Sequence, residues 1–281
     1  MRRIMAVGAA CLVLVALAFV GFQYISRQTV TREANRTATP LSAIKEKVNN
    51  EDLAQYFTGA SGSFVLFDQK ANEYYIYNAA ESQKRASPCS TFKILNSLIG
   101  LETGVVPDEN TPVKWDGTKY DIAVWNQDHT MTTAFGNSVV WYYQKLAAAV
   151  GTERMQHFLD ATHYGNANLS GGLTKFWLDS SLRISPLEQV LFLRQFYAYD
   201  LPFTHQNIDT VKRIMVMRRE NGSTLSGKTG TAGDHLSWFV GYLETDDNVH
   251  FFATKVEGKG ISNARARTIT ESILKEKNLL H

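Results

Sequence analysis

The sequence predicts an α/β fold of the α+β type, in which an antiparallel sheet is flanked by helices and an all-helical lobe is inserted into it. Aromatic and β-branched runs typical of strands occur early in the body of the chain and again near its end. The middle of the chain instead repeats apolar residues at helical spacing. Because strands from both ends would share one sheet, the helical middle is expected to form a second lobe beside it.

The first residues have the pattern of an export signal. Arg2 and Arg3 precede an uncharged run over residues 4–22, and Ala16-Leu17-Ala18 offers a small-x-small cleavage pattern. We expect residues 1–22 to be a signal peptide; the alternative is an uncleaved membrane anchor, because the run is near the lower limit for spanning a bilayer. Either alternative places the rest of the chain in the periplasm or at the outer face of the inner membrane.

Composition limits the classes of partner. The 281 residues are 44% hydrophobic, enough for a substantial core, and their formal net charge is +2, to which Arg2 and Arg3 contribute. No nucleic-acid partner is therefore expected. The seven histidines lack close ligand spacing, so no metal is expected. Cys89 is the single cysteine after the export segment, which excludes an intramolecular disulfide after cleavage, and the oligomeric state stays open.

The segments after the export signal divide the chain further. Residues 23–50 are polar and are interpreted as a spacer leading into a first helix, and residues 51–281 as one catalytic domain. Within that domain we expect an α/β lobe from residues 51–88 and 206–281, and a helical lobe from residues 89–205.

Local patterns predict the individual elements. A hairpin is expected where two aromatic runs, 63–68 and 74–78, flank Gln69-Lys70-Ala71-Asn72. We expect helices over residues 138–150, 153–161 and 186–199, strands over 237–244 and 249–256, and a closing helix over 263–279. The site would then lie at the seam between the lobes, where pockets commonly form.

Ser90-Thr91-Phe92-Lys93 carries the first chemical signal. An apolar run follows it, so a helix beginning near Ser90 would place positions i and i+3 on one face and set a hydroxyl beside an amine. A serine hydroxyl is a poor nucleophile and a solvated lysine is protonated, so both need an altered environment. An apolar pocket would favour the neutral amine of Lys93.

Lys228-Thr229-Gly230 carries the second signal. The string from Gly222 to Thr229 formally matches a phosphate-binding loop, but such a loop needs a buried strand before it and a helix after it, whereas a strand follows here. As the edge strand of the sheet, it would instead offer an ammonium and a hydroxyl to an anionic ligand. Gly230 would let the substrate approach the backbone.

These strings together are the signature of penicillin-recognising serine enzymes. Further strings narrow the resemblance: Ser138-Val139-Val140, Tyr164-Gly165-Asn166, Trp177-Leu178 and Trp238-Phe239-Val240-Gly241-Tyr242. In this order they resemble a class D, oxacillinase-type, serine β-lactamase, from about Phe64 to the C-terminus. The fold implied is the two-lobe penicillin-recognising serine hydrolase fold.

The resemblance implies that Ser90 attacks the lactam carbonyl of a small-molecule β-lactam and forms an acyl-enzyme, which confers antibiotic resistance once hydrolysed. It implies that Lys93 is carbamylated by carbon dioxide or bicarbonate and is the general base of both steps, with no other cofactor. Ser138 would relay a proton to the lactam nitrogen. Because only a neutral amine reacts with carbon dioxide, we expect a desolvated pocket around Lys93, lined by Val140 and Leu178.

The resemblance assigns the remaining site residues as well. The indole N–H of Trp177 would hydrogen-bond the carbamate, and the backbone N–H groups of Ser90 and Thr231 would form the oxyanion hole. Lys228 and Thr229 would hold the substrate carboxylate, helped by an arginine of the closing helix. Arg265 and Arg267 are both candidates, and Arg267 is our choice.

Two related functions remain as alternatives. A β-lactam-sensing receptor domain and a peptidoglycan peptidase would carry the same serine and lysine but keep the acyl group. The single apolar segment and the length of the chain favour the lactamase over the sensor. The Ser-x-Val string at Ser138 and the Trp177-Leu178 pair favour it over the peptidase.

Overall fold

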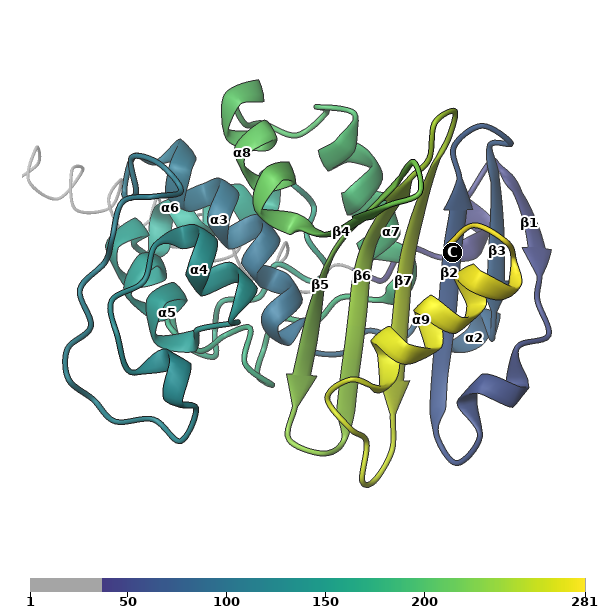
Figure 1. Cartoon of the computed structure of the whole chain (residues 1–281), viewed down its shortest axis with the longest axis horizontal. Helices are drawn as coiled ribbons and strands as arrows, with labels where there is room; N and C mark the ends of the chain where they lie inside the picture. Colours follow the sequence, from purple (N-terminus) through teal and green to yellow (C-terminus); the bar gives the residue numbers. More distant parts are fainter. Residues whose placement is uncertain (1–36, 281) are drawn as a thin grey trace, which may run out of the picture. The chain divides into compact units, whose positions relative to one another are not determined.

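A seven-stranded sheet is the centre of the computed structural model, which describes residues 37–280 (Figure 1). Its strands are β1 (Lys47–Asn50), β2 (Ser61–Asp68), β3 (Glu73–Tyr77), β4 (Val216–Glu220), β5 (Ser223–Ala232), β6 (Leu236–Glu244) and β7 (Val249–Glu257). They lie in the order β1-β3-β2-β7-β6-β5-β4. The hairpin and the two late strands are as predicted. The sheet is mixed and not wholly antiparallel, because β1 pairs in parallel with β3.

Helices cover the sheet and form the second lobe. They are α2 (Ala79–Ser82), α3 (Lys93–Glu102), α4 (Met131–Gly136), α5 (Val140–Val150), α6 (Thr152–Ala161), α7 (Pro186–Tyr197), α8 (His205–Met215) and α9 (Arg265–Glu276). Short 3-10 turns occupy Leu41–Ala43, Ala54–Phe57, Cys89–Phe92 and Ala123–Trp125. The helices expected around α5, α6, α7 and α9 are therefore confirmed, with ends shifted by up to three residues.

The N-terminal predictions are only partly covered. The signal peptide or anchor over residues 1–22 lies outside the described residues, as does the spacer up to residue 36. The helix expected at the end of the spacer is absent from residues 37–50. This segment instead holds a 3-10 turn and β1. The reason is tertiary, since β1 is stabilised by pairing with β3. Between residues 37 and 280, no helix combines the length and the apolar run that a bilayer span requires.

Both faces of the sheet are buried. Alternate residues of β7 point to opposite sides: Phe252 packs with Ile269 and Ile273 of α9, and Phe251 packs with the core of the other face. Figure 1 shows α9 in front of the sheet and α7 behind it. The predicted helical lobe, residues 89–205, includes α7. In the structure α7 packs on β2, β6 and β7, so it is part of the α/β lobe.

The helical lobe surrounds α3. This helix contacts α5 on one side and α8 on the other, and residues 93–101 are all buried. The α8 helix also contacts α4 and β5. Hence α8 joins the helical lobe to the sheet, although the predicted boundary assigns residues 206–215 to the α/β lobe alone.

The edge of the sheet differs from the prediction in one respect. The outermost strand is β4, not β5. However, β4 pairs with β5 only as far as Ser226, so Gly227 to Ala232 have no strand partner on their outer side. The segment that contains Lys228, Thr229 and Gly230 is thus an open edge beside the helical lobe.

Candidate active site

The Ser90 hydroxyl is held on a tight turn ahead of a buried helix. Cys89–Phe92 forms a 3-10 turn, and α3 begins at Lys93, slightly later than the sequence predicts. Cys89 has φ +50°, a left-handed conformation that costs energy for a residue with a side chain. The turn is closed by the Thr91 amide and hydroxyl, which both donate to the Pro88 carbonyl at 3.1 and 2.8 Å.

Lys93 lies within hydrogen-bonding distance of that hydroxyl. Its Nζ is 2.7 Å from Ser90 Oγ, and its side chain is fully buried. Burial lowers the pKa of Lys93 well below the ordinary value of a lysine, and the nearby charge of Lys228 lowers this pKa further. The neutral amine is therefore favoured, and in that form it can accept the proton of Ser90.

Gly230 explains how the sheet reaches this turn. A Cβ atom at this position would lie 2.8 Å from the carbonyl oxygen of Pro88 and 3.1 Å from the backbone nitrogen of Thr91. No side chain fits between β5 and the turn. The absence of one lets the open edge of β5, with Thr231 next along it, pass directly beside the nucleophile.

Ser138 and Lys228 connect the two lobes at the other side of the site. Ser138 follows α4 with φ +54°, and its Oγ accepts a hydrogen bond of 3.1 Å from Lys228 Nζ on β5. The same ammonium donates to the Thr229 carbonyl at 3.1 Å. Burial lowers the pKa of Lys228 to about 7. A lysine poised in this way can both bind an anion and exchange a proton with Ser138.

The two candidate arginines are separated by the structure. Arg267 lines a cavity together with Lys228 and Thr229, and its Nε donates to Glu271 at 2.6 Å. Arg265 instead donates to the backbone carbonyls of Tyr56 and Thr58. Of the two arginines, Arg267 is therefore the one that a carboxylate bound to Lys228 could reach.

Trp177 presents a buried donor without a partner. Its side chain is fully buried, and its ring packs on Phe92 with centroids 5.5 Å apart. Its carbonyl accepts from Ser87 Oγ at 2.9 Å, and Trp238 Nε1 of β6 donates to the Ser87 carbonyl at 2.9 Å. Within the described part of the chain Trp177 Nε1 donates to nothing. Buried donors are rarely left so, which indicates a missing acceptor.

The pocket around Lys93 has a member that the sequence analysis did not identify. Val140 is the half-buried first residue of α5, and Leu178 is half-buried after Trp177. The ring of Tyr143, also on α5, is fully buried and lies 5.3 Å from Lys93 Nζ. Burial raises the pKa of Tyr143, whose hydroxyl pairs with Ser97 at 2.8 Å. Tyr143 lies five residues after Ser138 in the helix predicted there, and this proximity is the sequence signal that could have identified it.

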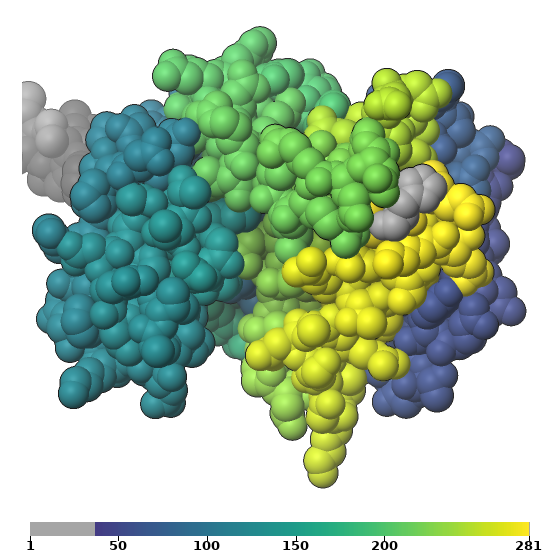
Figure 2. All heavy atoms as spheres, in the orientation of Figure 1, coloured from purple at the N-terminus to yellow at the C-terminus, as the bar shows by residue number. Residues whose placement is uncertain are grey.

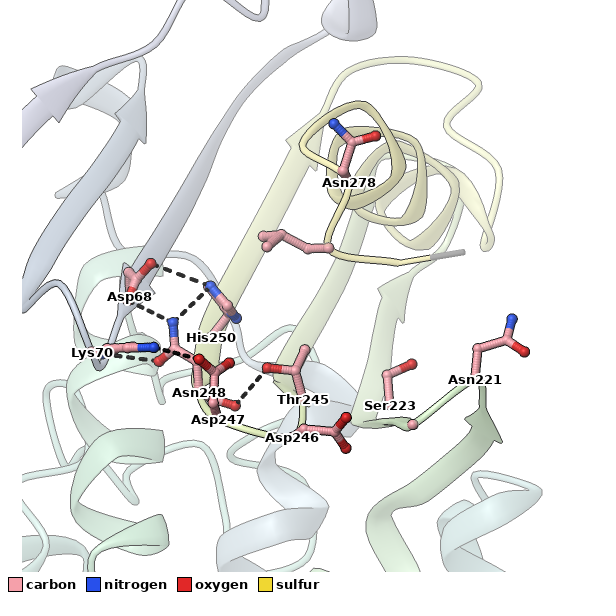
Figure 3. Close-up of a pocket in the computed structure, with 12 residues that line it drawn as sticks. Asp68, Lys70, Asn221, Ser223, Thr245, Asp246, Asp247, Asn248, His250 and Asn278 are labelled. Atoms are coloured by element: carbon pink, nitrogen blue, oxygen red, sulfur yellow. Dashed lines mark hydrogen bonds and ion pairs between the residues drawn. The ribbon is translucent and has the colours of Figure 1, made fainter.

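Two further features of the chain are candidate sites: the string that matches a phosphate-binding loop, and a second cavity. Gly222 to Thr229 runs from the β4–β5 turn into an antiparallel strand, so it lacks the helix of a phosphate-binding loop. A separate cavity of about 470 Å³ lies at the end of the sheet where β5 begins, and Figure 3 shows its polar lining. There His250 Nε2 lies 3.3 Å from Asp68, and this cavity contains none of the predicted site residues.

The comparisons with known proteins agree with this site. Residues 62–277 match the family described as the penicillin binding protein transpeptidase domain. The chain is 42% identical to the regulatory protein BlaR1 of Bacillus licheniformis over 83% of its own length, and it spans 40% of the length of that protein. It is 40% identical to the probable β-lactamase YbxI of Bacillus subtilis, over 83% of this chain and 87% of YbxI.

A solved structure supports the same assignment. The crystal structure of a class D β-lactamase from Bacillus subtilis superposes with a TM-score of 0.79 at 40% identity, covering 82% of this chain and 97% of that one. The family match over residues 62–277 contains the Ser90 turn and the open edge of β5. The chain therefore belongs to the penicillin binding protein transpeptidase family, as a class D penicillin-recognising serine enzyme.

Proposed function

We propose that this protein hydrolyses the amide bond of β-lactams through an acyl-enzyme on Ser90. The observation that carries the proposal is the buried Lys93 amine, 2.7 Å from Ser90 Oγ and shifted toward its neutral form. Relatives described as β-lactamases, YbxI and OXA-48 of Klebsiella pneumoniae, support the same activity.

Acylation follows from the positions of the side chains. Lys93 takes the proton of Ser90 as its Oγ attacks the lactam carbonyl, and the C–N bond of the ring then breaks. The backbone N–H groups of Ser90 and Thr231 stabilise the developing oxyanion. Ser138 gives its proton to the departing nitrogen and recovers one from Lys228, 3.1 Å away. Lys228, Thr229 and Arg267 hold the substrate carboxylate.

We further propose that Lys93 carries a carboxylate derived from carbon dioxide. A neutral, desolvated amine is the reactive form toward carbon dioxide, and the modified side chain would supply an anionic base in place of an amine. The residues present fit such a group, because Trp177 Nε1 is a buried donor with no acceptor among the described residues. Trp177 would hold the carboxylate, and Lys93 would take a proton from the water that cleaves the acyl-enzyme.

A sensor is the second candidate. The relative at 42% identity is the regulatory protein BlaR1, so this family includes proteins described as regulatory as well as β-lactamases. A sensor would form the same Ser90 adduct and keep it. The two functions therefore differ in the rate of deacylation and not in the first chemical step.

Turnover distinguishes the two functions. We expect the purified protein to hydrolyse many equivalents of a chromogenic β-lactam in the presence of bicarbonate, and Lys93→Ala to lose turnover. Absorbance kinetics followed by intact mass would measure this. A single stoichiometric burst that leaves a lasting adduct on Ser90 would show the sensor function instead.

The indole N–H of Trp177 provides a test of the modification. Trp177→Phe keeps an aromatic ring on Phe92 but removes the donor, so its activity should depend strongly on added bicarbonate. With carbon-13 bicarbonate, NMR should show a carbamate signal in the native protein that weakens in this variant. Trp115→Phe is the control, because the indole of Trp115 donates to the Thr118 carbonyl outside the site. Equal carbamate signals in all three proteins would refute the assignment to Trp177.

The two arginines predict different effects on substrate binding. Arg267→Ala should raise KM for carboxylate-bearing β-lactams about tenfold or more, because a charged hydrogen bond contributes roughly 1.5–3 kcal/mol. Arg265→Ala should change KM little, since its guanidinium binds backbone carbonyls of Tyr56 and Thr58. Steady-state kinetics of both variants would measure this, and the reverse ranking would move the carboxylate contact to Arg265.

Lys228 should make stability depend on pH. Its pKa is about 7 when folded, whereas an unfolded lysine titrates near 10.4, so the unfolded chain binds more protons between these values. The free energy of unfolding should therefore rise between pH 7 and 9, by about 2 kcal/mol more in the native protein than in Lys228→Met. Urea unfolding at each pH would measure it, with the exposed Lys259→Met as control. Parallel pH profiles for the native protein and Lys228→Met would contradict the shift.

A further inference from the structure

The cavity at the carboxylate-binding end of the site has two chemically different walls. It measures about 240 Å³ and lies between α4, α8, β4, β5 and the beginning of α9. Lys228, Thr229 and Arg267 form the polar wall. Figure 2 shows the hollow between the teal helical segments and the yellow α9, with green β5 recessed between them. The other wall is apolar and includes Phe135, Ile214, Val216 and Met217.

The inner part of the apolar wall is fixed by packing. Phe135 is 2% exposed on α4, and Lys228 Nζ lies 5.7 Å from the centroid of its ring. A capping box between Thr130 and Thr133 fixes the start of α4. A substituent attached near the substrate carboxylate would therefore meet an aromatic ring as soon as the carboxylate reached Lys228.

The outer part of the apolar wall is set by a bulge. Val216 pairs with Ser226 and Arg218 with Leu225, so Met217 is the extra residue of β4 and has no partner on β5. Such bulges redirect the side chains that they contain. Met217 lines the cavity and is still 37% exposed, where a surface strand would normally carry a polar residue.

The charges around the cavity are of one sign. Of the nine residues that line it, Arg267 is charged, Lys228 becomes charged as it takes up a proton near pH 7, and none is acidic. The substrate carboxylate is attracted to this wall. A cationic substituent on the same side of the substrate would find like charge, because the nearby carboxylate of Glu271 is already paired with Arg267, and this disfavours its binding. A second anionic group would have to lose its hydration against Phe135 and Met217.

We propose that this cavity selects β-lactams whose substituent beside the carboxylate is apolar and uncharged, and that Met217 determines this preference. The inference rests on the proposed reaction at Ser90. The cavity would discriminate between substrates by the substituent next to their carboxylate. This substituent would lie where the bulge of β4 and the end of α8 meet α4.

Two cephalosporins with the same acylamino side chain test the proposal. One carries a methyl group at carbon 3 and the other a cationic pyridiniomethyl group. The rate constant of Ser90 acylation is measured for each by intact mass over time, and the ratio of the two is compared between variants, so that their intrinsic reactivities cancel. Met217→Glu adds an unpaired carboxylate to the lining and should shift the ratio toward the cationic compound about tenfold. Met217→Leu keeps the apolar wall and should leave the ratio unchanged.

The control variant separates local contact from bulk charge. Val124 is also exposed, at 38%, but does not line this cavity, so Val124→Glu should leave the ratio unchanged. An unchanged ratio in Met217→Glu, or an equal shift in Val124→Glu, would overturn the proposal. Acylation precedes deacylation, so a protein that formed adducts without turnover would contradict hydrolysis and still report the preference. A native protein that neither compound acylated would overturn both.

Discussion

The burial of two lysine side chains in one site is the constraint on which the rest of this structure depends. Lys93 is fully buried and Lys228 is 4% exposed, and in the described part of the chain their polar partners are Ser90 for Lys93 and Ser138 and Thr229 for Lys228, with no carboxylate. Burial without a counter-ion favours the neutral amine, which destabilises the fold but creates a base. The surrounding core supplies the compensating stability: α3 is buried along its length, and both faces of the sheet are covered.

The position of the site follows from how the two lobes meet. The proposed nucleophile, Ser90, comes from a turn at the start of the central helix, whereas Lys228 and Thr229, the residues proposed to bind the carboxylate, come from the open edge of β5. Gly230 allows contact between these elements, and left-handed backbones occur at Cys89, which precedes Ser90, and at Ser138. Such conformations persist only where packing enforces them, and they commonly occur at functional sites.

The family to which this chain belongs includes proteins described as β-lactamases and proteins described as regulatory. Both need a nucleophile, a base and an oxyanion hole for acylation. What separates them is whether the base remains active after the acyl group has formed. Under the proposed function that property would depend on the surroundings of Lys93, where Trp177 offers an unused donor and Tyr143 an aromatic wall.

The sequence by itself determined the local features of this protein. Aromatic and β-branched runs predicted the hairpin, the late strands and the sheet. Helical spacing predicted α5, α6, α7 and α9, because periodicity records which face of a helix is buried. It does not record what that face is buried against. The tertiary structure alone decided that β1 is a strand, that α7 covers the sheet, that β4 extends beyond β5, and that Arg267 and Met217 share one cavity. The contact of Ser138 with Lys228 spans 90 residues, and only packing of the whole chain brings such residues together.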